Sequence, residues 1–168
     1  MISEAYRELQ VQKHAMGAYG TSGHMYAPMV DDIAKQLKTS DILDYGCGKR
    51  TLESALGYFI RNYDPAIPEL ADPPTYPADI VVCSDVLEHI EPEHLDAVLD
   101  DLKRLTRKIG FFVIATGPAN KVLADGRNAH LIQEGPEWWL PKIMARFELK
   151  QFASQKHCFI VLVKARPQ

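Results

Sequence analysis

Apolar residues along the chain follow two kinds of pattern, and these alternate. Residues 79–84 and 111–115 form nearly continuous apolar runs, typical of strands buried on both faces of a parallel sheet. Residues 41–45 predict a further short strand that leads into a glycine turn. Between the later runs, apolar residues recur at helical spacing, at Leu95, Val98, Leu99, Leu102 and Leu105. Strands alternating with helices predict an α/β fold with a mostly parallel sheet.

Weaker patterns predict the remaining elements. Gly110 follows the helix that opens near Pro92 and is expected to end it. The other predicted helices are 3–15, 27–38 (apolar at Met29, Ile33 and Leu37), 51–59 (Leu52, Ala55, Leu56 and Phe59) and 137–146. A second strand is predicted within 58–63, and 147–153 with 158–164 predict a C-terminal antiparallel hairpin. Five prolines within 65–77 exclude a regular helix or central strand there.

Composition narrows the class of protein. The 168 residues suit a single domain, 1–168, and the net charge of −3 lacks the basic excess of non-specific nucleic-acid binders. The three cysteines are widely spaced in apolar stretches, which favours a reducing compartment, and we expect a cytoplasmic protein. The polar N-terminus and the short apolar runs predict neither a signal peptide nor a membrane span.

The glycine turn after the first predicted strand carries the strongest chemical signal. Asp44-Tyr45-Gly46-Cys47-Gly48 places two glycines between a strand and a helix, where a nucleotide-bearing ligand lies in doubly wound sheets. Thr51 stands where a dinucleotide fingerprint would have its third glycine, and the P-loop pattern also fails. A second acid, Asp64, ends the next predicted strand, where it can bind a ribose diol.

These elements resemble those of the class I S-adenosylmethionine-dependent methyltransferases. The glycine turn looks like their motif I, Asp64 like their ribose-binding acid, and 85–90 (DVLEHI) like the segment after their fourth strand. The resemblance runs from about residue 41 to the C-terminal hairpin and implies a Rossmann-like, doubly wound sheet. It implies that the cofactor S-adenosylmethionine is bound by Asp44, Gly46, Gly48, Asp64, Pro65, Ser84 and Asp85.

The chain departs from the family pattern at two places. Arg50 replaces the usual third glycine; it either meets the cofactor carboxylate or is a solvated residue at a helix start. The stretch 65–78 is too short for the family's helix, third strand and second helix, so we expect that region to be reduced. Asp72 is the nearest candidate for an adenine contact there. The surrounding Asp-Pro-Pro-Thr-Tyr (72–76), although similar to a DNA amino-methyltransferase motif, is interpreted as a loop.

Catalytic candidates cluster after the strand at 79–84. Asp85, Glu88 and His89 share one face if 85–90 turns helically, and His130 in a later loop is expected at the same sheet edge. His89 can serve as a general base, because imidazole titrates near neutral pH. Alternatively Asp85, Glu88, His89 and His130 bind a divalent metal (Mg, Mn, Fe or Zn), a set that resembles the metal site of small-RNA 2′-O-methyltransferases. A packed Leu-Glu-His unit without metal remains the structural alternative.

Substrate contacts are expected from two regions flanking this cluster. An N-terminal helical lid, 1–38, precedes the cofactor-binding core, 39–168. The expected substrate residues are Tyr19, His24, Tyr26, Arg127, His130 and Trp138. The resulting hypothesis is O-methylation of a small molecule or nucleotide. Its alternatives are a nucleic-acid methyltransferase (RNA 2′-O or base) and a non-catalytic S-adenosylmethionine-binding partner subunit. The sequence leaves the oligomeric state open.

Overall fold

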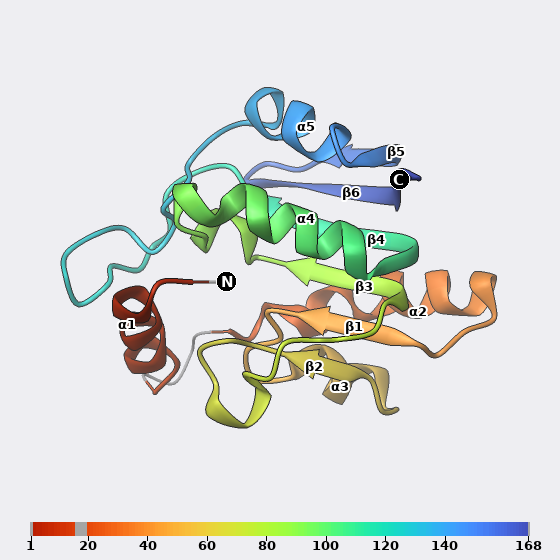
Figure 1. The fold of residues 1–168 in the computed structure, drawn as a ribbon, viewed down its shortest axis with the longest axis horizontal. Helices are drawn as coiled ribbons and strands as arrows, with labels where there is room; N and C mark the ends of the chain where they lie inside the picture. Colours follow the sequence, from red (N-terminus) through yellow and green to blue (C-terminus); the bar gives the residue numbers. More distant parts are fainter. Residues whose placement is uncertain (1, 16–19, 168) are drawn as a thin grey trace.

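The computed structural model describes residues 2–15 and 20–167 and has a six-stranded sheet with helices on both faces (Figure 1). The helices are α1 (Glu4–Ala15), η1 (Ser22–Tyr26), α2 (Ala27–Leu37), α3 (Thr51–Leu56), η2 (Pro68–Leu70), η3 (Leu87–His89), η4 (Pro92–His94), α4 (Leu95–Leu105) and α5 (Pro136–Met144), η marking 3₁₀ turns. The strands are β1 (Ile42–Tyr45), β2 (Arg61–Tyr63), β3 (Ala78–Ser84), β4 (Thr106–Ala115), β5 (Phe147–Ser154) and β6 (Cys158–Ala165). No described helix has the length and apolar character that a membrane crossing requires.

The strand order is β2-β1-β3-β4-β6-β5. The first four strands in this order are parallel, and β6 pairs antiparallel with both β4 and β5. This confirms the expected doubly wound, mostly parallel sheet with a C-terminal antiparallel hairpin. Residues 64–77 contain only the turn η2 and irregular backbone, so the third strand of the family pattern is absent and β2 is an edge strand.

Side chains alternate between two apolar layers because successive strand residues face opposite sides of a sheet. In β3, Val81 and Cys83 pack beneath α4 and α5, whereas Ile80 and Val82 pack beneath α2 and α3. Figure 1 shows α4 and α5 together on one face of the sheet. The helical pattern predicted for α4 is confirmed, because all five of its apolar positions are buried.

Several predicted boundaries and faces were wrong. β4 begins at Thr106, five residues before the apolar run, because its first half pairs with the start of β3. α3 ends at Leu56, where Gly57 caps it with φ +74°, so Phe59 is not on the helix and is 79% exposed. In α2 the fully buried residues are Ala27, Val30 and Ala34. Met29, which was predicted on the apolar face, is 46% exposed.

Arginine side chains hold the proline-rich connection that replaces the missing strand. Arg61 donates to the carbonyls of Tyr76 and Pro77 at 2.9 and 3.0 Å. Arg104 donates to the carbonyl of Pro74 at 2.8 Å, and Arg107 to that of Pro77 at 3.0 Å. No strand among the described residues pairs with these carbonyl oxygens, so the guanidinium groups supply the donors that a neighbouring strand would otherwise provide.

Candidate active site

A cavity of about 800 Å³ opens at the carboxyl ends of the parallel strands. Parallel strands end at one edge of a sheet, so the loops that follow β1, β2, β3 and β4 meet there. Figure 1 shows α1 lying beyond this edge. The lining comes from residues within 2–10, 20–22, 46–48, 64–66, 85–90, 115–121 and 129–130, together with His157.

The glycine turn forms one wall of the cavity. Gly46 and Gly48 have φ of +80° and +49°, in the left-handed region that favours glycine. A Cβ on Gly46 would overlap the methyl groups of Val86, and one on Gly48 would lie 2.6 Å from the carbonyl oxygen of Gly20. Both glycines are therefore required by close packing as well as by backbone conformation.

Two acids support this turn from different sides. Asp64 lines the cavity; its Oδ2 accepts a hydrogen bond from the Gly48 amide at 3.0 Å, and its Oδ1 accepts one from the Ala66 amide at 2.9 Å. Asp44 is buried behind the turn and is not part of the lining. Burial, with the nearby charges of Asp64 and Glu53, raises the pKa of Asp44 to about 7.

The other expected cofactor residues are divided between the cavity and the core. Pro65 and Asp85 line the cavity, whereas Ser84 is buried in the last position of β3 and does not. Arg50 is exposed and lies outside the lining, and so does Asp72 in its loop. The structure therefore places the glycines, Asp64, Pro65 and Asp85 around one space.

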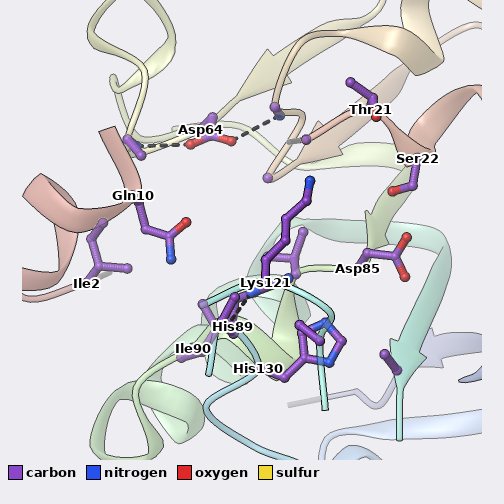
Figure 2. Close-up of a pocket in the computed structure, with 18 of the residues that line it drawn as sticks. Ile2, Gln10, Thr21, Ser22, Asp64, Asp85, His89, Ile90, Lys121 and His130 are labelled. Atoms are coloured by element: carbon purple, nitrogen blue, oxygen red, sulfur yellow. Dashed lines mark hydrogen bonds between the residues drawn. The ribbon is translucent and has the colours of Figure 1, made fainter. Parts of the chain in front are cut away.

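A histidine pair with a buried glutamate forms the opposite wall. His89 and His130 lie edge to face, with ring centroids 4.8 Å apart. Glu88 lies behind them with no exposed surface, and its Oε1 is 4.0 Å from Nε2 of His130. Burial, with the nearby charge of Asp85, raises the pKa of Glu88 to about 8. Figure 2 shows the two rings at one end of the cavity and Asp64 at the other.

Backbone carbonyls orient both imidazole rings. Nδ1 of His89 lies 2.6 Å from the carbonyl oxygen of Ala129, and Nδ1 of His130 lies 2.6 Å from that of Gly117. A carbonyl oxygen can only accept a hydrogen bond, so each Nδ1 must carry the proton. In the neutral ring the lone pair is then on Nε2.

The expected grouping of Asp85 with Glu88 and His89 is wrong in geometry. The residues do not form one helical face, because Asp85 has φ +54° and the helical turn η3 begins only at Leu87. The Asp85 carboxylate instead accepts a hydrogen bond from the Ser22 side chain, and burial raises its pKa. Among the described residues, the cluster with metal-ligand spacing consists of Glu88, His89 and His130 without Asp85.

The roof of the cavity is α1, which lies within the expected N-terminal lid, although none of its residues was predicted in the site. Tyr6 and Gln10 of α1, with Ile2 just before it, contribute to the cavity, and Tyr6 packs with Leu123 and Ala129 of the 116–131 loop. Glu91 holds the start of α1 through hydrogen bonds from the backbone and side chain of Ser3, at 2.7 and 2.6 Å.

Lys121 and His157 also line the cavity, and neither was predicted as a site residue. The Lys121 side chain extends into the space between the walls (Figure 2). The sequence signal for the roof was the expected N-terminal helical lid over 1–38, which did not single out the lining residues Ile2, Tyr6 and Gln10.

Most of the expected substrate residues lie elsewhere. His130 is in the lining, while Tyr19 falls outside the described residues. His24 is exposed, with Nδ1 2.7 Å from the Thr21 carbonyl oxygen, and Tyr26 packs against Phe111 with ring centroids 6.0 Å apart.

Arg127 and Trp138 lie outside the lining as well. Arg127 pairs with Asp125 at 2.7 Å and stacks over the Tyr6 ring at 5.8 Å. Trp138 lies on α5, where the ammonium group of Lys142 is 4.1 Å from its ring centroid. Arg127 therefore contacts the roof from outside, and Trp138 has no contact with the cavity.

The chain matches a protein-family model and several solved structures. The model, described as a methyltransferase domain, matches residues 22–159. A search of curated proteins found no match. The chain is similar to the Burkholderia thailandensis 1,6-didemethyltoxoflavin-N1-methyltransferase, solved with S-adenosylhomocysteine: TM-score 0.68, 17% identity, covering 96% of this chain and 87% of that one.

Two further solved structures show the range of proteins that share this fold. The Synechocystis magnesium protoporphyrin IX methyltransferase with bound S-adenosylhomocysteine matches with a TM-score of 0.58 and 15% identity, covering 84% of this chain and 83% of that one. An Escherichia coli rRNA methylase matches with a TM-score of 0.58 and 12% identity, covering 98% and 78%.

Proposed function

Because the chain belongs to the class I S-adenosylmethionine-dependent methyltransferases, we propose that its cavity binds S-adenosylmethionine against the glycine turn and an acceptor against the histidine pair. The observation that carries this proposal is the arrangement of the two walls. Asp64, which holds the glycine turn through the Gly48 amide, lies at one end, and His89 and His130 lie at the other (Figure 2). Structures of similar fold hold S-adenosylhomocysteine or S-adenosylmethionine.

The cofactor side offers a contact for each part of the ligand. Asp64 binds the ribose hydroxyls, since it lines the cavity and the amides of Gly48 and Ala66 hold its carboxylate in place. Gly46 and Gly48 leave room for the methionine part along the backbone. Asp85 accepts from the methionine amine, and Pro65 flanks the adenine. Asp44 and Ser84 support this wall from the core.

The acceptor is an oxygen of a small molecule or nucleotide. Its lone pair attacks the methyl carbon in line as the bond from that carbon to sulfur breaks, leaving S-adenosylhomocysteine. In the protein alone, Nε2 of His89 takes the hydroxyl proton, because the carbonyl of Ala129 keeps the ring proton on Nδ1. Of the lid expected over 1–38, the part that covers the cavity is the α1 region with Ile2, Tyr6 and Gln10, and this roof favours a small acceptor over a duplex.

Transfer of a tritiated methyl group from S-adenosylmethionine to pools of metabolites, nucleotides, RNA and DNA tests this function. We expect labelled product from the metabolite or nucleotide pool. Labelling of RNA or DNA alone would instead identify a nucleic-acid methyltransferase. An absence of transfer together with retained cofactor binding would identify a binding subunit.

Once the acceptor is identified, the variant His89→Gln tests whether His89 is the general base. We expect kcat to fall by about 10²–10⁴-fold, because the variant cannot accept the hydroxyl proton. The matched control is His24→Gln, since His24 is exposed outside the lining, and it should retain the parent kcat. An unchanged kcat in His89→Gln would refute the assignment.

A further inference from the structure

Glu88, His89 and His130 bring three metal-ligating side chains to the acceptor end of the cavity. One ligand atom from each lies within 4.8 Å of the other two. We propose that these residues bind a single divalent transition-metal ion, of the zinc, manganese or iron type. Its chemical role rests on the proposed function, whereas the binding itself does not.

The orientation of the rings suits metal binding. Each Nδ1 donates to a backbone carbonyl, of Ala129 or Gly117, at 2.6 Å. Metal-ligating histidines characteristically hold their second nitrogen in this way, because it directs the Nε2 lone pair toward the ion. The same carbonyls hold both rings on the wall of the cavity, where an ion can enter.

The buried glutamate gives a second, independent indication. Glu88 is fully buried, its Oε1 accepts a hydrogen bond from the Ala115 amide at 3.2 Å, and its Oε2 has no hydrogen-bond partner within residues 2–15 and 20–167. A buried carboxylate oxygen without a partner is unfavourable, and such groups are rare in folded proteins. A cation bound by Glu88 and the two rings would favour the ionised carboxylate and compensate its charge in the buried site.

Distances and ligand types indicate which ion fits. Ligands at about 2.1 Å from one tetrahedral ion lie about 3.4 Å apart, so the ligand atoms, now within 4.8 Å of one another, need to approach by up to about 1.4 Å. Two imidazoles with one carboxylate suit zinc, iron or manganese, whereas calcium and magnesium prefer oxygen ligands alone. Asp85 is excluded as a ligand because it is turned toward Ser22.

Three protein ligands leave coordination positions open toward the cavity. An acceptor hydroxyl bound there would lose its proton to water more readily, because a divalent ion lowers the pKa of a bound hydroxyl group. The resulting oxyanion would then attack the methyl carbon of the cofactor. In the metal-bound enzyme the ion replaces His89 in activating the acceptor, since the Nε2 lone pair of His89 is then a ligand.

Titration of the chelator-treated full chain with Co²⁺, followed by calorimetry and visible absorption, tests the site. We expect a single ion to bind, with absorption bands typical of a nitrogen- and oxygen-ligated cobalt site. His130→Ala and Glu88→Gln should each weaken binding by about 100-fold or more. His157→Ala is the matched control, because His157 also lines the cavity but lies outside the cluster, and it should bind like the parent.

The proposal is overturned if the parent binds no Co²⁺ up to about 1 mM, or if both variants bind as the parent does. Because Glu88 is buried, its variant is used only if its circular dichroism matches the parent. His130, whose side chain is partly exposed, provides the second variant. Methyl transfer by the metal-free enzyme at the full rate would refute the role of the ion while leaving the methyltransferase function intact.

Discussion

Replacing Gly48 by alanine perturbs the glycine turn where the N-terminal segment crosses it. Gly48 has φ +49°, and an added Cβ would lie 2.6 Å from the Gly20 carbonyl oxygen and 2.8 Å from its Cα. These are backbone atoms, so no side-chain rotation can relieve the overlap. The segment at Gly20 must shift, which removes its hydrogen bond from the Lys49 amide at 3.0 Å.

Gly57 provides a matched control for the magnitude. Its φ is +74°, but an added Cβ would meet nothing within 4 Å. A left-handed alanine costs about 1–2 kcal/mol, partly offset by about 0.4–1 kcal/mol from the stiffer unfolded chain, so Gly57→Ala should lower the free energy of unfolding by about 1 kcal/mol. Gly48→Ala additionally loses a backbone hydrogen bond of about 1 kcal/mol, for a total of about 2 kcal/mol.

Urea unfolding measures these stabilities, and calorimetric titration with S-adenosylhomocysteine measures the effect on the cavity. We expect Gly57→Ala to bind the ligand like the parent and Gly48→Ala to bind at least tenfold more weakly, since Gly48 and Gly20 both line the cavity. Equal stability and equal affinity of the two variants would refute the close contact between Gly48 and Gly20.

Three further outcomes are expected. Glu91→Gln weakens the bonds from Ser3, so hydrogen exchange in α1 should accelerate, whereas in Glu93→Gln, an exposed neighbour, it should not. Hydrogen bonding to Lys108 lowers the pKa of Asp79 from 3.8 to about 2, so its contribution is present at neutral pH and lost as pH falls from about 4 to 2. Asp79→Asn should therefore be less stable than the parent in urea at pH 7, and the difference should shrink toward pH 2. Trp138→Phe should leave the KM values for cofactor and acceptor unchanged in steady-state assays, because Trp138 lies outside the cavity lining.

Local sequence patterns predicted most of the sheet and the cofactor wall. Continuous apolar runs marked β3 and the inner half of β4, and the glycines of the turn marked a backbone that only they readily adopt. The shortness of 65–78 predicted the loss of a strand, because too few residues remain to cross the sheet twice. These features depend on residues that lie close together in the sequence, so the sequence alone is enough to predict them.

Features that depend on distant contacts or on the sign of one φ angle could not be predicted. The positive φ of Asp85, a residue without glycine's freedom, turns its carboxylate away from Glu88 and His89. The roof depends on the pairing of Ser3 with Glu91, 88 residues apart, which no periodicity indicates. Trp138 lies in α5, as the helix predicted over 137–146 required, but which side of that helix faces the cavity depends on its packing against the sheet.

Calorimetric titration of S-adenosylhomocysteine into the parent, Asp64→Ala and Asp72→Ala tests the central claim most directly. Asp64 holds its carboxylate in the cavity, whereas Asp72 is an exposed loop residue outside it. We expect a single site in the parent, unchanged affinity in Asp72→Ala, and at least tenfold weaker binding in Asp64→Ala. An absence of binding in the parent, or equal affinity in Asp64→Ala, would contradict the assignment of this cavity to the cofactor.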